Sequence, residues 1–100
     1  MRLTNFPALF VSCLLLSVNV VADFDKGLAA YDTGDYGRAF REWKPLAEQG
    51  QPDAQLNLGA MYDSGYGVIQ DHVYAYMWFN IASANGLETA RENRDLVAKN

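Results

Sequence analysis

The stretch DSGYGVIQD, residues 63–71, invites a chemical interpretation because two glycines stand between two aspartates. A calcium loop of the EF-hand type needs oxygen ligands at positions 1, 3 and 5, glycine at 6 and glutamate at 12. Counted from Asp63, positions 3 and 5 are Gly65 and Gly67, and position 6 is Val68, so this pattern fails. A phosphate loop needs a lysine after its glycines, and the stretch has none. We therefore predict a connector whose glycines adopt positive φ, with no metal and no cofactor.

His72 is the only histidine, and it follows Asp71, a pairing that can act as a base or as a metal ligand. No serine or cysteine nucleophile arrangement and no second ligand stands near it in the sequence. Partial packing at the start of a helix explains His72 more simply. We therefore predict no catalytic residue and no enzyme.

An internal repeat explains where the DSGYGVIQD stretch and His72 lie in the fold. YDTG at residues 31–34 resembles YDSG at 62–65, an offset of 31, and from residue 35 onward the offset is 36. A five-residue insertion in the connector explains the change, so the second copy is the first with a longer connector. The pairs at the second offset are Asp35/Asp71, Ala39/Ala75, Phe40/Tyr76, Trp43/Phe79, Gly50/Gly86 and Ala54/Ala90.

Each copy is predicted to be a pair of helices. The second helix of the first copy spans about 36–49, where apolar residues recur at helical spacing. Asp35 stands at its N-cap and Gly50 at its C′ position, and Asp71 and Gly86 take the same places in the second copy. The predicted stripe is Tyr36, Ala39, Phe40, Trp43, Leu46 and Ala47, with Tyr76 and Phe79 continuing it in the second copy.

The first helices of the two pairs are shorter. One is predicted over Asp53–Asp63 and one over Phe24–Asp32, where Gly27 weakens the helix. Pro45 should remove one hydrogen bond from its helix and bend it. A fifth helix should run from Glu88 to about Lys99. The residues expected to be buried on these three helices are Leu58, Met61 and Tyr62, then Leu28 and Tyr31, and last Ala90, Leu96 and Val97.

Residues 1–22 form a separate segment. Arg2 supplies positive charge, an apolar run covers 6–21, and Val20 and Ala22 fit the −3 and −1 positions of a signal-peptidase site. The run is shorter than the roughly 20 residues of a spanning helix. We predict a signal peptide cleaved after Ala22. The alternatives are an uncleaved anchor and a lipoprotein at Cys13, although apolar residues continue past that cysteine.

The expected mature chain, residues 23–100, contains no cysteine. Without Arg2 it keeps 7 of the 8 basic side chains and all 12 acidic ones, a net charge of −5. The protein would thus enter an oxidising compartment, periplasmic or extracellular, without disulfides. This charge gives no sign of a nucleic-acid partner and favours a basic protein partner. No membrane attachment is expected after cleavage.

The second copy carries a pattern of small, apolar and aspartate residues at fixed spacing. Its positions are Ala54, Leu58, Gly59, Met61, Tyr62, Gly65, Gly67, Val68, Asp71, Ala75, Trp78, Ala82 and Gly86. This pattern resembles a Sel1-like repeat, a relative of the tetratricopeptide repeat. YDTGDYGRAFREWKPLAEQG, residues 31–50, resembles a degenerate first repeat that lacks the G-x-GV loop.

The resemblance implies an all-α fold, an α/α solenoid of two helix pairs and a C-terminal helix, divided into residues 23–50, 51–86 and 87–100. It implies an exported bacterial adaptor or scaffold for protein–protein contacts. A structural, self-associating periplasmic protein is the alternative. Some cysteine-rich secreted members are β-lactamases, but their helix pairs are held by disulfides, which argues against a hydrolase here.

Two surfaces are candidates for a partner. In tetratricopeptide-like solenoids the first helices line the concave face, and here that face would offer an acidic rim to a basic or extended peptide. The candidate concave-face residues are Asp25, Asp32, Asp53, Leu56, Ala60 and Asp63. The helix after Asp71 is apolar on a second side as well, which either core packing or an interface explains. The residues of that side are Tyr74, Met77, Trp78 and Ile81.

Overall fold

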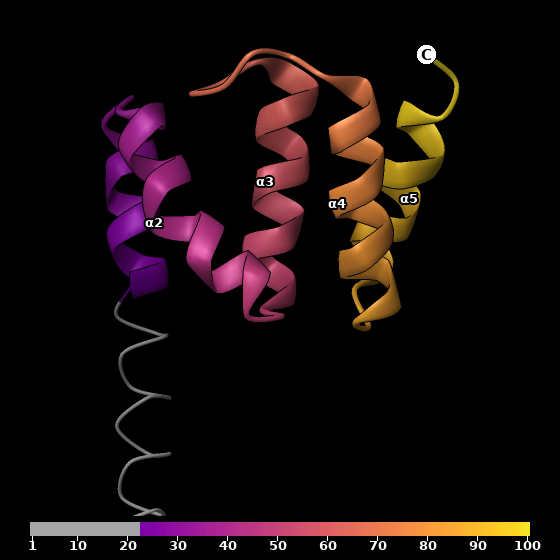
Figure 1. Ribbon diagram of the computed structural model, residues 1–100, viewed down its shortest axis with the longest axis horizontal. Coiled ribbons are helices and arrows are strands. Elements are labelled where there is room, and N and C mark those ends of the chain that lie inside the picture. The colour runs from indigo at the N-terminus through magenta and orange to yellow at the C-terminus, as the bar shows by residue number, and fades with distance from the viewer. Residues whose placement is uncertain (1–22) are drawn as a thin grey trace, which may run out of the picture.

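The computed structural model describes residues 23–100, which form an all-α array of helices (Figure 1). The predicted leader, with its cleavage site after Ala22, lies outside the described residues. α3 lies between α2 and α4, and α5 packs against α4. This is the predicted α/α solenoid, and no strand occurs in residues 23–100. Its helices are residues 23–32, α2 (Tyr36–Glu48), α3 (Pro52–Ser64), α4 (His72–Ala84) and α5 (Glu88–Val97).

The second helices, α2 and α4, begin and end at the residues that the repeat predicts. The Asp35 carboxylate accepts a hydrogen bond from the backbone N–H of Arg38 at 3.2 Å. The Asp71 carboxylate accepts from two backbone N–H groups, those of Val73 and Tyr74, at 3.0 and 3.1 Å. Both predicted N-caps are confirmed, because each satisfies amide groups that the first helical turn leaves free.

Left-handed glycines follow both helices, as predicted. Gly50 and Gly86 have φ of 98° and 105°. The backbone can therefore reverse directly after α2 and after α4. Pro45 lies inside α2, where the sequence places it.

One aromatic side chain fills the centre of each helix pair. In the first repeat (residues 23–32 and α2), a Cβ at Gly27 would overlap the Trp43 indole. In the second repeat (α3 and α4), a Cβ at Gly59 would overlap the Phe79 ring. The indole Nε1 of Trp43 also donates to the backbone carbonyl of Phe24 at 3.0 Å. The two glycines therefore let the helices of each pair approach closely around a large ring.

This packing corrects the prediction for the first helical segment. Leu28, expected on its buried face, is 44% exposed, while Gly27 and Ala30 are buried. Trp43 is too large to lie beside a leucine at the centre of the pair, so the segment turns its glycine inward. Gly27 weakens the isolated helix, as expected, but it creates the space that the indole fills.

The stretch DSGYGVIQD, residues 63–71, is a connector, as predicted. Gly65 and Gly67 have φ of 75° and 76°. Tyr66, between them, stacks on Tyr36 with ring centroids 4.6 Å apart and planes 8° apart. A Cβ on Gly67 would lie 2.6 Å from the carbonyl oxygen of Tyr36. Val68 is partly buried against the core. The connector of the second repeat thus lies directly on the first.

α5 occupies the place of the first helix of a third pair. The offset of 36 that relates the two repeats also relates α3 to α5, since Pro52 corresponds to Glu88. Ala54 and Ala90 have no exposed area, and Met61 and Val97 are both buried. The prediction of a fifth helix is confirmed, with one correction.

That correction concerns Leu96, which was expected to be buried. It is 61% exposed. Its counterpart in α3 at the same offset is Ala60, also exposed. The position therefore faces outward on both helices.

Candidate functional site

A groove of about 380 Å³ runs between the two equivalent helices α3 and α5. Phe79 of α4 contributes an apolar surface to it, and Leu96 and Val97 of α5 add further apolar area. The polar part comes from both walls. The remaining lining residues are Ala60, Asp63 and Ser64 of α3 and Asn93 and Asn100 at the other side. This mixture suits an extended peptide, which offers backbone polar groups and alternating side chains.

Two of the six candidate concave-face residues line this groove. They are Ala60, which is exposed, and Asp63, which stands near the end of α3. Leu56 differs from the prediction, because it is partly buried against the cluster formed by Ala75, Phe79 and Val97. A first-helix leucine is drawn inward when a neighbouring helix offers apolar area. The three remaining candidates, Asp25, Asp32 and Asp53, are exposed and lie outside the groove lining.

Asp63 is also paired with His72, which the sequence did not predict. Its carboxylate lies 3.0 Å from Nδ1 of His72, and both side chains are partly exposed. The two residues are nine positions apart, and only the path of the connector brings the end of α3 back to the start of α4. The contact holds the Asp63 carboxylate at the edge of the groove.

The candidate apolar side of α4 is divided in the structure. Trp78 packs against the core cluster to which α2 and α3 both contribute, and Ile81 is partly buried, so neither belongs to an open face. Tyr74 stacks on Tyr62 with ring centroids 5.1 Å apart and keeps about half its area exposed. Tyr74 and Met77 are thus the two candidates that remain on the surface.

Tyr76 corrects the prediction in the opposite direction. It was expected on the buried stripe, as the counterpart of Phe40, and it is 41% exposed. With Val73 and Met77 it forms an exposed row that we call the outer α4 stripe. Periodicity could not reveal this row, because α4 is apolar on most of its circumference and any of its sides could have been the buried one.

Residues 52–87 match the family model of the Sel1 repeat. This segment of the chain is a Sel1 repeat. The matched segment contains α3, the connector and α4, which is one complete helix pair. Sel1 repeats commonly mediate protein–protein interactions. No curated protein and no solved structure matched the chain in comparisons of its sequence and fold.

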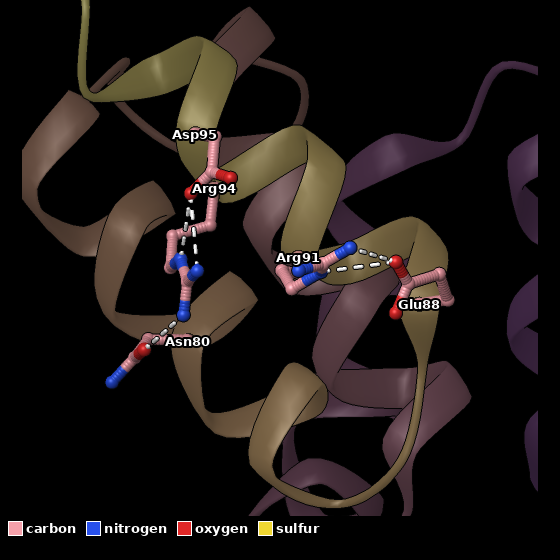
Figure 2. A network of polar contacts seen from close by, with 5 residues as sticks. All are labelled: Asn80, Glu88, Arg91, Arg94 and Asp95. Carbon is pink, nitrogen blue, oxygen red and sulfur yellow. Dashed lines mark hydrogen bonds and ion pairs between the residues drawn. The ribbon is translucent and has the colours of Figure 1, made fainter.

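α5 follows the Sel1 repeat and carries a network of charged side chains, which Figure 2 shows. Arg94 donates from Nη1 to the Asn80 side chain at 3.0 Å and pairs with Asp95, and Arg91 pairs with Glu88. In α3 the positions equivalent to Arg91, Arg94 and Asp95 are Gln55, Leu58 and Gly59.

Two of these three α3 residues contact α4 or its C-cap residue Asn85, and Leu58 belongs to the core cluster that α2 and α3 share. Gln55 accepts a hydrogen bond from Asn85 at 2.9 Å, and Gly59 touches Phe79. Arg91 and Asp95 stand at the places of Gln55 and Gly59, so a helix that packed on α5 as α4 packs on α3 would have to bury their charges. α5 is therefore charged on the side that α3 uses to pack against α4.

Tyr31 and Tyr62 lie in packed clusters of aromatic rings. Burial, followed by the nearby Tyr36, Tyr66 and Asp32, raises the pKa of Tyr31. Burial also raises the pKa of Tyr62, with Tyr74 and Asp71 adding to the effect. Both phenols are therefore neutral at physiological pH.

Within residues 23–100, no three His, Cys, Asp or Glu side chains come together as a metal site would require.

None of the helices in that part of the chain has the length and apolar character needed to cross a bilayer.

Proposed function

We propose that the protein is an exported adaptor or scaffold that binds a protein or peptide partner in the α3–α5 groove. The observation that carries this proposal is the groove itself, which lies between two equivalent first helices of a Sel1 array. Its apolar part, with Phe79 and Leu96, can bury a side chain, and its polar rim can bond a peptide backbone. An adaptor needs such a surface and no reacting group.

The partner that fits best is an extended segment with basic side chains. Asp63 brings a carboxylate to the groove, and Asp25, Asp32 and Asp53 are exposed on the other first helices. Residues 23–100 carry a net charge of −5, since 7 basic side chains face 12 acidic ones. This charge attracts a basic segment over a distance of about a Debye length and repels an acidic one.

The groove can be tested with a matched pair of variants. Ala60 lines it, and Ala29, its counterpart at the offset of 31, is exposed on the first helical segment. Ala60→Lys places bulk and positive charge in the groove, while Ala29→Lys makes the same chemical change elsewhere. The probes are fluorescent peptides that alternate Lys with Leu or Glu with Leu, followed by anisotropy.

We expect the basic peptide to bind more tightly, and Ala60→Lys to weaken it at least about tenfold, a loss of about 1.4 kcal/mol. Ala29→Lys should change the affinity by much less. Replacing Asp25, Asp32, Asp53 and Asp63 together by alanine should also weaken binding and reduce its salt dependence. Equal binding of the two peptides, or equal loss in the two lysine variants, would refute the groove as the site.

Export is a separate part of the proposal and rests on the sequence of residues 1–22. An adaptor of this kind would work in the periplasm of a Gram-negative bacterium or outside the cell. The intact mass of the protein from its native host measures this directly. A chain that begins at Asp23 supports cleavage after Ala22, whereas a chain that keeps Arg2 contradicts it.

A further inference from the structure

α4 has an unusual composition for a helix at the surface. None of its 13 residues is Asp, Glu, Lys or Arg, yet seven of them are exposed. The outward side of a surface helix ordinarily carries charged or polar residues. Here it carries the outer α4 stripe, in which Val73 is 80% exposed. Ile69, in the connector just before α4, is also almost fully exposed. Apolar surface gathered in this way marks a site of association.

The first repeat shows that the fold does not require this stripe. Its counterpart on α2 consists of Gly37, Phe40 and Arg41. Arg41 is charged and exposed, and Phe40 is partly covered by the Tyr62 ring, whose centroid lies 5.7 Å away at 85°. On α4 the position of Phe40 is held by Tyr76, and the residue equivalent to Tyr62 is Ala98, which is too small to cover it.

This missing cover leaves a second groove, of about 380 Å³, between α4 and α5. It lies beside the outer α4 stripe and shares Val73 and Tyr76 with it. The lining contains no Asp, Glu, Lys or Arg side chain. We call it the α4–α5 groove, and its lining residues are His72, Val73, Tyr76, Val97, Ala98 and Asn100.

We propose that two copies of this chain pack α4 against α4, and that each inserts apolar side chains of its outer α4 stripe into the α4–α5 groove of the other. A two-fold contact needs one patch that is complementary to itself. The outer α4 stripe and the α4–α5 groove lie side by side on one face. A two-fold axis that passes between them therefore places the stripe of each copy against the groove of the other copy. Val73 and Met77, four residues apart, form a ridge of the kind that packs into a groove between side chains.

Charge favours a second copy over another occupant. Residues 23–100 carry a net charge of −5, so most approaches of two copies bring acidic groups together. Along α4 no carboxylate opposes the contact, because the helix has none. The lining of the α4–α5 groove, in turn, offers no Asp or Glu side chain to a strongly basic partner and no Lys or Arg side chain to an acidic one. Met77 can adapt its flexible side chain to an irregular surface made by its own copy.

The opposite end of the molecule excludes an open chain of copies. At the positions of Tyr74, Met77 and Trp78, α2 carries Arg38, Arg41 and Glu42. A head-to-tail contact would therefore bury charged side chains against the uncharged groove. The contact is closed and two-fold. The three side chains of the outer α4 stripe, together with Ile69, bury less than the roughly 800 Å² per partner of a standard interface, so the dimer is weak.

The test is sedimentation equilibrium of the protein, expressed from its whole coding sequence and purified in the form the cell makes. The weight-average mass should rise from the monomer towards twice that value between about 10 μM and 1 mM, as expected of a small interface. Val73→Glu/Met77→Glu should raise the dissociation constant at least tenfold. Arg41→Glu is the matched control at the position equivalent to Met77, and it should leave the mass curve unchanged.

A mixing experiment distinguishes the two-fold contact from a general loss of folding. Val73→Lys/Met77→Lys should also be monomeric by itself. An equimolar mixture of the acidic and basic double variants should regain the dimer mass, because the glutamates of one copy then face the lysines of the other. A wild-type chain that stays monomeric at 1 mM would overturn the proposal. So would a dimer that survives in the acidic variant, or a mixture that remains monomeric while circular dichroism shows both variants to be helical.

Discussion

The two repeats share their interiors and differ on their outer sides. α2 and α4 start at equivalent N-caps, bury an alanine at the same position and hold a large ring at the next inward position, Trp43 or Phe79. The outer side of α2 is charged, whereas α4 has no charged residue at all. The repeat therefore specifies caps, glycines and one central ring, and it leaves the outward residues free. Exposed apolar residues on the outer side of a helix, as on α4, therefore indicate where a binding function can be sought.

The interior half of this comparison predicts the largest effect. Trp43→Ala and Phe79→Ala should each lower the free energy of unfolding by about 3–5 kcal/mol, because each leaves a cavity at the centre of a helix pair. Trp43→Ala should cost more, since its indole also donates to the Phe24 carbonyl and lies against the Tyr31 ring.

Urea denaturation followed by far-ultraviolet circular dichroism measures both changes. Trp43→Phe is the control that keeps a ring and removes the hydrogen bond, and it should lose about 1–3 kcal/mol. If Phe79→Ala were much the more destabilising of the two alanine variants, the first repeat would not be an equal part of the cooperative unit.

The connectors give the next comparison. Gly67→Ala would force an alanine into a left-handed conformation and against the Tyr36 carbonyl, and we expect a loss of about 2–3 kcal/mol. Gly34→Ala has a similar φ of 83° but meets nothing within 4 Å, so it should cost only about 1 kcal/mol. Denaturation midpoints of the two variants test whether the longer connector is held by its contact with the first repeat. Equal losses would show that backbone conformation alone sets the cost.

A third comparison concerns glycines inside helices. Gly59→Ala would push a methyl group into the Phe79 ring and should destabilise the protein by about 1–3 kcal/mol. Gly37→Ala, in the first turn of α2, meets only the end of the Arg41 side chain at 3.6 Å. It should stabilise the protein by about 0.5–1 kcal/mol through helix propensity and a less flexible unfolded chain. Opposite shifts in melting temperature are expected, and shifts of the same sign would contradict the packing described here.

The sequence could predict the caps and the connector because their causes are local. Asp35 and Asp71 accept hydrogen bonds from amides two or three residues ahead. Gly65 and Gly67 occupy positions where the backbone has a positive φ, which glycine adopts most easily. No distant residue is needed for either inference. The same holds for the family, whose pattern is a matter of spacing along one helix pair.

The faces of the helices were harder to predict because other helices decide them. Leu28 and Leu96 were expected inside and are exposed, since glycine or small neighbours at the contact allow a closer approach. For Trp78 the sequence left core packing and an interface open, and the side chain packs against the core cluster to which α2 and α3 both contribute. α4 is apolar around most of its circumference, so its sequence could not tell which side would be covered.

The candidate site was predicted only at one wall. Ala60 and Asp63 belong to α3, whose periodicity is clear, but Asn93 and Leu96 lie on α5. α5 keeps some small and apolar residues of a first helix, such as Ala90. At other positions, the charged residues drawn in Figure 2 stand where α3 has uncharged ones. The continuation of the 36-residue offset from Ala54 to Ala90 was the one signal that could have revealed the second wall.

The smallest predicted effect compares the two N-caps. Asp71→Ala removes two hydrogen bonds to backbone amides and Asp35→Ala removes one, so we expect losses of about 1–2 and about 0.5–1 kcal/mol. Replacement by asparagine keeps an oxygen acceptor and should recover most of each loss, which separates capping from the charge that also favours this helix end. Thermal unfolding at low and at high salt makes that separation. A larger loss for Asp35→Ala would mean that α2 depends on its first turn more than α4 does. That result would be expected only if the uncharged outer side of α4 were stabilised by packing against a second copy.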